Sequence, residues 1–245
     1  MRISVIIPTL NEEAHLPVTL RQLAEHSDVE LIVVDGGSTD TTVEVAREFT
    51  SYVFVSRPGR ARQMNMGAAH ATGDILLFLH ADTFLLPGAI GEIQRRIIGG
   101  AAGGAFDLTI DSPRRALRWV ARIASRRSRL LHLPYGDQGI FMWRRVFEDI
   151  GGYPDIEILE DIALGRKLRR TGRLTFIRSG VITSARRWET NGLVKTTLVN
   201  WWVTFLFFIG VSPRELRRIY DGWLPGADAR PAPRETVSRG HPAGE

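Results

Sequence analysis

The sequence predicts an α/β protein in which a mostly parallel sheet is flanked by helices. Apolar stretches of strand length alternate with helical patterns through the N-terminal part, as in strand–helix–strand units with right-handed crossovers. The stretch Ile75–Leu79 is apolar without interruption, which favours a parallel strand buried on both faces. With 245 residues, the chain is long enough for one large domain with a full core.

The expected elements can be placed in order along the chain. Strands are expected at residues 3–7, 30–35, 52–55, 74–79 and 105–110, and in a short apolar run that ends at Trp143. Helices are expected at residues 12–26, after Thr41, before His70, and at residues 87–98, 113–131 and 162–170. Asn11 is placed to cap the first helix, and Thr41 with Glu44 has the pattern of a capping box at the second.

Charge and cysteine content narrow the function classes. The chain has 32 Lys and Arg against 27 Asp and Glu, a net charge of +5, and much of the excess lies between Arg114 and Arg129. Such a stretch suits an anionic partner, or is only solvated surface. No nucleic-acid recognition motif accompanies it, so nucleic acid is not expected as a partner. The absence of cysteine and of a signal-peptide pattern favours the cytoplasm.

Polar side chains follow three of the expected strands where each strand ends. Thr9 and Asn11 follow the first strand, Asp35 ends the second, and His80 with Asp82 follows the fourth. A lone carboxylate at such a place is often only a helix cap. Because ligands of open parallel sheets bind at the carboxyl ends of the strands, the recurrence of polar groups favours a binding site there.

A basic segment between the third and fourth strands adds cations and amides. Arg60, Arg62 and Asn65 lie where a helix is expected to begin, which suits contact with an anion. The alternative is a helix whose basic first turn is simply solvated.

These motifs, taken in order, resemble those of a known family. The stretches Pro8–Glu12, Val33–Asp40, Arg60–Gly67 and His80–Asp82 resemble the successive signatures of the family-2 inverting glycosyltransferases. The resemblance covers about the first two-thirds of the chain, and it is carried by order and spacing. It implies a GT-A fold, which is Rossmann-like, with a nucleotide-diphospho-sugar as the donor substrate.

The resemblance also implies roles for individual residues. The carboxylate matching Asp35 contacts the base and ribose, Thr9 and Glu12 line the same cleft, and an Asp-x-Asp motif holds a divalent metal on the diphosphate. Arginines such as Arg62 and Arg187 are expected to offset the diphosphate charge. The residues expected to bind the donor are Pro8, Thr9, Asn11, Glu12, Asp35, Arg62, Asn65, His80, Ala81, Asp82, Arg187 and Trp188.

The metal motif departs from the family pattern because His80 replaces its first aspartate. Asp82 remains as the expected ligand of Mg²⁺ or Mn²⁺, and one carboxylate with diphosphate oxygens and water suffices for Mg²⁺. His80 is open to three interpretations: a soft ligand that tolerates Mn²⁺, a contact to the ribose, or a capped core histidine.

A second acidic site is expected before the helix at residues 162–170. In the family, an acidic pair at this place supplies the catalytic base, and Asp161 matches it by position. A helix N-terminus favours the ionised carboxylate, as a base requires, although a structural acid would have the same sequence. Arg186–Trp188 resembles a degenerate form of the family's Gln-x-x-Arg-Trp motif, with Thr183 in place of glutamine, which favours a single-transfer enzyme.

The expected function is transfer of a sugar from a nucleotide diphosphate to an acceptor hydroxyl, with inversion and metal assistance. One alternative is a nucleotidyltransferase, which would release pyrophosphate instead of a nucleoside diphosphate. Another is a non-catalytic module that binds nucleotide or a membrane surface, as the arginines of residues 114–129 suggest.

The C-terminal part is expected to form an appendage. Residues 196–213 carry no charge and include several aromatic side chains, which favours an interfacial helix on the inner face of the membrane over a dimer interface or a buried helix. The domain boundaries expected are 1–190 for catalysis, 191–224 for the helical appendage and 225–245 for a disordered tail. The apolar segment also hints at a lipid-linked or apolar acceptor, and a homodimer is the alternative assembly.

Overall fold

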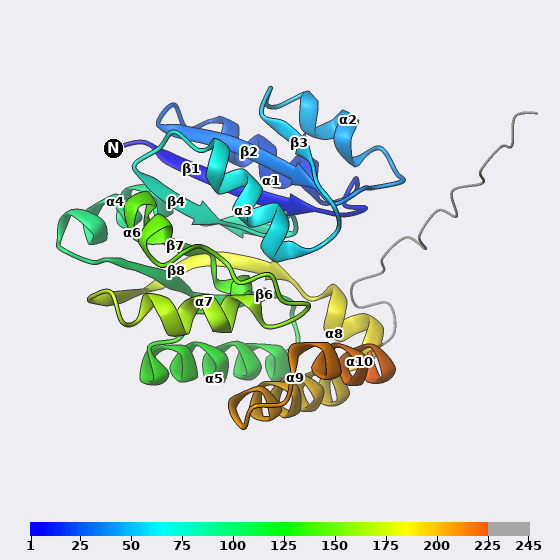
Figure 1. The fold of residues 1–245 in the computed structure, drawn as a ribbon. Coiled ribbons are helices and arrows are strands. Elements are labelled where there is room, and N and C mark those ends of the chain that lie inside the picture. Colours follow the sequence, from blue (N-terminus) through cyan, green and yellow to red (C-terminus); the bar gives the residue numbers. More distant parts are fainter. Residues whose placement is uncertain (225–245) are drawn as a thin grey trace, which may run out of the picture.

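The computed structural model describes residues 1–224 of the chain, which form one mixed sheet covered by helices (Figure 1). Residues 225–245, expected to be a disordered tail, lie outside the described part. The strands are β1 Ile3–Thr9, β2 Val29–Asp35, β3 Val53–Val55, β4 Ile75–Phe78, β5 Thr83–Leu85, β6 Gly103–Asp111, β7 Ile140–Trp143 and β8 Leu174–Ser184. The helices are α1 Leu16–Ala24, α2 Thr42–Arg47, α3 Arg60–His70, α4 Ala89–Ile98, α5 Arg115–Leu131, the 3-10 turn η1 Gly136–Gln138, α6 Arg144–Asp149, α7 Glu160–Leu168, α8 Arg186–Asn191, α9 Leu193–Phe208 and α10 Pro213–Trp223.

The sheet has eight strands in the order β3-β2-β1-β4-β7-β6-β8-β5. Strands β3, β2, β1 and β4 are all parallel, as predicted. The other half differs, because β7 runs antiparallel to β4 and β6, and β5 runs antiparallel to β8. The parallel order is therefore limited to the part of the chain in which strands and helices alternate strictly, together with the β6–β8 pair.

Helices bury both faces of the parallel half. Alternate residues of β4 enter different clusters: Ile75 and Leu77 pack with α1 and α4, whereas Leu76 and Phe78 pack with α3, α6 and α7. All residues of this strand are buried, which confirms the prediction drawn from its uninterrupted apolar run. A strand that is buried on both faces can be followed by polar side chains only beyond its end. The polar residues His80 and Asp82 begin there.

Three details differ from the sequence predictions. Strand β8 was not predicted; its Gly180 has φ +154°, and the ring of Phe106 occupies the place of a side chain there. Helix α1 begins four residues later than predicted, without a side-chain cap, because Asn11 adopts a left-handed conformation with φ 54° and bonds to Thr39. The Thr41 hydroxyl donates to Glu13 and so forms no capping box.

The C-terminal helices pack on each other and on the segment that precedes α7. The apolar segment expected at residues 196–213 divides into α9 and the start of α10, which follow α8 directly. Val199 and Val203 of α9 form a small core with Leu216 and Tyr220 of α10 and with Ile158, which precedes α7. Within residues 1–224, no helix has both the length and the apolar character needed to cross a bilayer.

Candidate active site

A cavity of about 510 Å³ lies at the carboxyl ends of β1 and β4. Its strand end is formed by the residues that follow β1, β4 and β8, by the start of α3 and by α8. Its helix end is formed by α5, α9 and α10, while η1 and the start of α7 lie between the two. Ten predicted residues line this one cavity: Pro8, Thr9, Asn11, Glu12, His80, Ala81, Asp82, Asp161, Arg187 and Trp188.

Three other predicted residues do not line the cavity, and Asp35 is the first of them. Its side chain lies beside Thr9 in the register of β1 and β2 and is only 1% exposed. One carboxylate oxygen accepts hydrogen bonds from the backbone of Gly37 at 2.8 Å and Ser38 at 2.7 Å, and the other accepts one from Thr9 Oγ1 at 3.2 Å. In this structure Asp35 shapes the turn after β2, and its role towards a nucleotide stays a prediction.

Arg62 and Asn65 also point away from the cavity. Arg62 donates through Nε to Asp155 at 3.0 Å on the surface, and Asn65 exchanges two hydrogen bonds with the backbone of Tyr153. The helical period explains the difference, because Arg60 and Gln63 occupy the face of α3 that lines the cavity. Arg62 and Asn65 are also three residues apart, so spacing in the sequence could not have selected one pair over the other.

Gln63 closes the floor of the strand end. Its amide donates to the carbonyl oxygens of Thr9 and Val34, each at 2.8 Å, and the side chain is buried. These bonds satisfy backbone groups at the ends of two parallel strands and hold the strands together. The loops that carry Thr9 and Asp35 are thus fixed from below.

Two carboxylates share one guanidinium at the strand end. Arg186 Nη2 lies 2.8 Å from Glu12 Oε1 and 3.7 Å from Asp82 Oδ2. The other oxygen of Glu12 is buried and accepts no hydrogen bond. Glu12, predicted as a wall residue, therefore retains an unused acceptor next to the predicted metal ligand.

The residues around Asp82 fit a divalent ion only together with phosphate. Among the described residues, no group of three or more His, Cys, Asp or Glu side chains could hold a metal. Mg²⁺ is commonly bound through one or two carboxylates, while water and substrate phosphate provide the other ligands. Asp82, with the unused Glu12 oxygen on the same arginine, meets this requirement.

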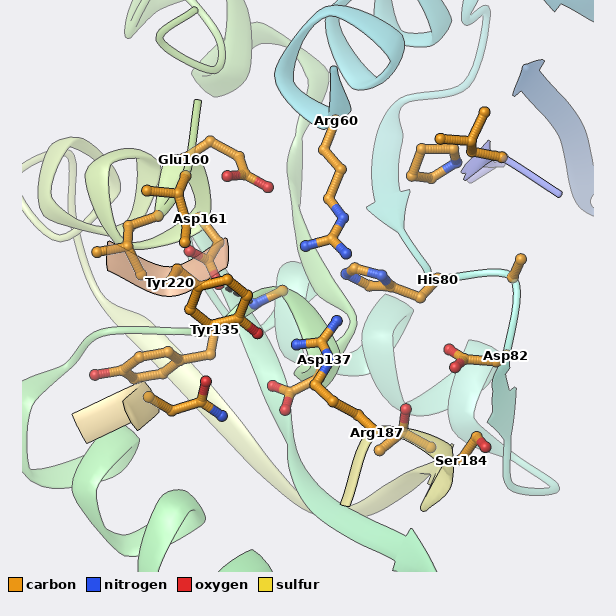
Figure 2. Close-up of a pocket in the computed structure, with 18 of the residues that line it drawn as sticks. Arg60, His80, Asp82, Tyr135, Asp137, Glu160, Asp161, Ser184, Arg187 and Tyr220 are labelled. Atoms are coloured by element: carbon orange, nitrogen blue, oxygen red, sulfur yellow. Dashed lines mark hydrogen bonds between the residues drawn. The ribbon is translucent and has the colours of Figure 1, made fainter. Parts of the chain in front are cut away.

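Asp161 lies across the cavity in the first turn of α7 (Figure 2). Its Oδ2 accepts a hydrogen bond from the backbone of Gly136 at 2.6 Å, and its Oδ1 accepts one from Ile162 at 2.7 Å. The two backbone hydrogen bonds therefore fix this carboxylate in one orientation.

His80 extends into the middle of the cavity. A Cβ atom built on Gly136 would lie 3.0 Å from His80 Nε2 and 3.3 Å from Asp161 Oδ2, so the imidazole and the carboxylate flank the same point. Figure 2 shows His80 between Arg60 and Arg187. His80 is half-buried and lines the cavity, and its role as a metal ligand or a ribose contact stays a prediction.

Asp137 is a site residue that the sequence analysis did not select. The pKa of Asp137 is raised from 3.8 to about 6, first by burial and then by the charge of Asp161, while Arg187 and Arg127 lower it. The sequence placed an acid and an amide before β7, but nothing in it showed that Asp137 would meet the acidic pair at α7. Only the packing of η1 against α7 brings them together.

Side chains from the C-terminal helices complete the helix end. Asn200 of α9 and Tyr220 of α10 line the cavity, although both were placed in an appendage. Tyr220 is only 4% exposed, and Figure 2 shows it extending towards the space beside Asp161 and Asp137. From α5, the Arg127 guanidinium lies over the ring of Tyr135, 4.0 Å from its centroid. No sequence motif marked these positions.

The fold and the site together define an enzyme class. A half-parallel sheet opens into a cavity with one carboxylate at the end of a parallel strand and another at the start of α7, an arrangement that fits a GT-A group-transfer enzyme. The model of glycosyl transferase family 2 matches residues 4–151, and the chain belongs to this family.

Relatives with known names match shorter stretches. A PGL/p-HBAD biosynthesis glycosyltransferase of Mycobacterium bovis (strain BCG / Pasteur 1173P2) is 36% identical over 132 residues, which are 43% of this chain and 52% of that protein. A 4,4'-diaponeurosporenoate glycosyltransferase of Staphylococcus haemolyticus is 40% identical over 92 residues, 34% of this chain and 24% of that protein. The chain thus spans about half the length of the first relative and about a quarter of the second.

Solved structures agree in fold over most of the chain. The S. aureus TarS 1-349 structure has a TM-score of 0.62 at 17% identity and covers 91% of this chain and 71% of that one. The mannosyltransferase PcManGT from Pyrobaculum calidifontis, in complex with GDP-Man and Mn²⁺, has a TM-score of 0.63 at 20% identity and covers 89% and 68%. At these identities the likeness shows the fold, including the C-terminal region beyond residue 151.

Proposed function

We propose that the protein transfers a sugar from a nucleotide-diphosphate donor to an acceptor hydroxyl, with inversion at the anomeric carbon. The observation that carries this proposal is that Asp82 and Asp161, 79 positions apart in the chain, line one cavity from opposite sides. Support also comes from the structural neighbours whose complexes contain GDP-Man with Mn²⁺ or UDP-GlcNAc. The donor is assigned to the strand end and the acceptor to the helix end.

Asp161 is the proposed general base. The acceptor oxygen attacks the anomeric carbon as its proton passes to the Asp161 carboxylate, and the bond between that carbon and the diphosphate oxygen breaks with its electron pair leaving on the diphosphate. Because attack and departure occur on opposite faces of the sugar, one displacement inverts the configuration. The hydrogen bonds from Gly136 and Ile162 hold the carboxylate in place for this transfer.

Positive charge at the strand end offsets the charge of the departing diphosphate. Asp82 would hold Mg²⁺ or Mn²⁺, and the bound ion supplies positive charge to the diphosphate oxygens. Arg60 and Arg187 line the cavity on either side of His80 and are placed to contact the same group. Arg60 thereby takes the role first expected of Arg62. Fixed charges aimed at a developing anion are commonly the largest single contribution in such reactions.

The decisive test changes the base while leaving the donor site intact. Asp161→Asn should lower sugar transfer by about 10²- to 10⁴-fold, since amide nitrogen cannot take the proton, while donor binding measured by calorimetry persists. Asp155→Asn is the matched control, because that exposed aspartate pairs only with Arg62 on the surface. Normal turnover in a folded Asp161→Asn protein would refute the assignment.

The same assay separates the alternatives. Release of a nucleoside diphosphate supports sugar transfer, whereas release of pyrophosphate would identify a nucleotidyltransferase. The absence of donor-selective heat with metal present would identify a non-catalytic module.

Domain boundaries, location and assembly stay predictions. The predicted boundary after residue 190 passes through the cavity wall, because Asn200 and Tyr220 line the cavity. We therefore treat residues 191–224 as part of the catalytic unit. The cytoplasmic location and the homodimer rest on the sequence alone.

A further inference from the structure

Helix α9 has two faces with different neighbours. Its inner face packs through Val199 and Val203 against α10. Its outer face exposes large apolar side chains, with Trp201 49% exposed, Trp202 54% and Phe205 52%. The outer residues continue the stripe at both ends and are Val194, Leu198, Trp201, Trp202, Phe205, Phe208 and Ile209. An exposed apolar stripe of this length indicates a surface that binds a membrane or another protein surface.

Helix α5 supplies a matching basic surface. Arg115, Arg118, Arg122 and Arg126 are exposed along this helix. The exposed Trp119 lies among them, with the Arg122 guanidinium 5.5 Å from its ring centroid. Tryptophan interleaved with arginine is typical of protein surfaces at lipid headgroup depth, where the ring is partly buried and the cation meets phosphate.

The two helices border the same end of the cavity. Ala124 and Arg127 of α5, and Asn200, Val203 and Thr204 of α9, all line it. In Figure 1 both helices lie on the side of the molecule away from β1, β2 and β3. Since one helix is about 10 Å in diameter, a surface covering their outer faces would lie within about that distance of the helix end.

We propose that this α5–α9 face docks on an anionic lipid bilayer, which brings the helix end of the cavity to the headgroup layer. Charge decides between a bilayer and a second copy of the chain. Neither α5 nor α9 contains an aspartate or glutamate, so a second copy of this face would offer no carboxylate on these helices to pair with the arginines. Anionic headgroups complement the arginines, and the acyl region accepts the aromatic stripe. The consequence that the acceptor hydroxyl is carried by a lipid rests on the proposed function.

Vesicle co-sedimentation of the full chain tests the docking directly. The protein should bind vesicles that contain phosphatidylglycerol, bind pure phosphatidylcholine much more weakly, and lose binding as salt is raised. Brominated lipid should quench tryptophan fluorescence on binding. Arg118→Gln with Arg122→Gln should weaken binding by roughly fivefold for each arginine.

A second variant pair tests the apolar half of the face. Trp201→Ser with Trp202→Ser should weaken vesicle binding by about tenfold or more and remove most of the quenching. Val18→Ser is the matched control, because Val18 of α1 is 54% exposed and lies outside this face. Equal binding to both lipid compositions, or light scattering that shows a dimer destabilised by the tryptophan variants without any vesicle binding, would overturn the proposal.

Docking and catalysis can fail independently. Asp161→Asn should bind vesicles as the unchanged protein does, because that residue lies inside the cavity. Vesicle binding without any release of nucleoside diphosphate from any donor would leave the docking intact and remove the proposed reaction. Sugar transfer to a water-soluble acceptor without vesicle binding would support the proposed reaction and overturn the docking.

Discussion

The strand end and the helix end of the cavity are built on different principles. At the strand end, side chains follow parallel strands and are held by backbone hydrogen bonds, as Asp35 and Gln63 illustrate. At the helix end, Tyr220 and Asn200 come from helices that follow the short α8 and pack on each other and on Ile158. The family match ends at residue 151, before these helices begin. The comparison teaches that the strand end, where we propose the donor binds, is set by strand topology, whereas the helix end depends on a separate layer of helices.

The largest effect is expected from substitutions at the strand end, where Asp82 is proposed to serve donor binding and Asp35 to stabilise the fold. Asp82→Asn should lower transfer by about 10²- to 10³-fold and weaken donor binding, since it removes the carboxylate proposed to hold the divalent ion on the diphosphate. Asp35→Asn should instead lower the unfolding temperature, because two backbone N–H groups lose a charged acceptor. Calorimetry with donor and metal, beside thermal unfolding, measures both. Equal donor affinity in the Asp82 variant would break the distinction.

Gly136 tests the point where the two ends meet. Gly136→Ala places a methyl group 3.0 Å from His80 Nε2 and 3.3 Å from Asp161 Oδ2, so one of these side chains must move. We expect sugar transfer to fall by about tenfold to a hundredfold, because small misplacements of a reacting group are costly. Gly91→Ala is the control, since a Cβ atom there meets nothing within 4 Å. Unchanged turnover in Gly136→Ala would show that His80 and Asp161 need no fixed separation.

Asp137 gives the helix-end side of the cavity a pH signature. Its folded pKa of about 6 exceeds the ordinary 3.8, so the folded state binds the proton more tightly and loses stability as the pH rises from about 4 to 6. In Asp137→Asn this loss is absent. The free energy of unfolding of the variant, relative to the unchanged protein, should therefore rise across this window, by roughly 1.4 kcal/mol for each unit of pKa difference. Chemical denaturation at several pH values measures it, and a pH-independent difference would contradict it.

Substitution of Tyr220 has the smallest expected effect, but it is the one that tests the proposed acceptor side of the cavity alone. Tyr220→Phe removes one hydroxyl from the cavity wall and should raise the acceptor KM by about three- to tenfold while the donor KM stays constant. The ring remains, so the core with Val203 and Leu216 is preserved. A change in donor KM alone would assign α10 to the strand end instead.

The sequence predicted the strands and helices in which apolar residues follow a short and regular pattern. The uninterrupted apolar run at Ile75–Leu79 identified a strand buried on both faces, and the turn after it located Asp82. Strand β8 escaped because its glycine and its polar residues obscure the pattern, although Phe106 requires that glycine. Helix α3 was predicted correctly, but the wrong face of it was assigned to the cavity. Arg62 and Asn65 were therefore selected in place of Arg60 and Gln63. A helix has one inward face, and only packing shows which one it is.

The remaining site residues depend on contacts between distant segments. Burial raises the pKa of Asp137, and the charge of Asp161, which follows it by 24 positions, raises it further. Tyr220 reached the cavity through the packing of two helices. No local pattern records such a contact, because burial and charge at one residue are set by others far along the chain. The prediction of Asp161 was possible only through resemblance to a family, and its role still awaits the tests above.

Arg186 links the two halves in a way that bears on the order of events. It belongs to α8, the helix directly before α9, yet its guanidinium is held by Glu12 and Asp82 at the far side. On the proposed function, the donor diphosphate would compete for that same guanidinium, and its arrival would release α8 from Glu12 and Asp82. The α9–α10 wall, where we propose the acceptor binds, would then reach its final arrangement only after the nucleotide donor has bound. Steady-state kinetics should therefore show compulsory ordered addition, with the nucleotide donor binding first.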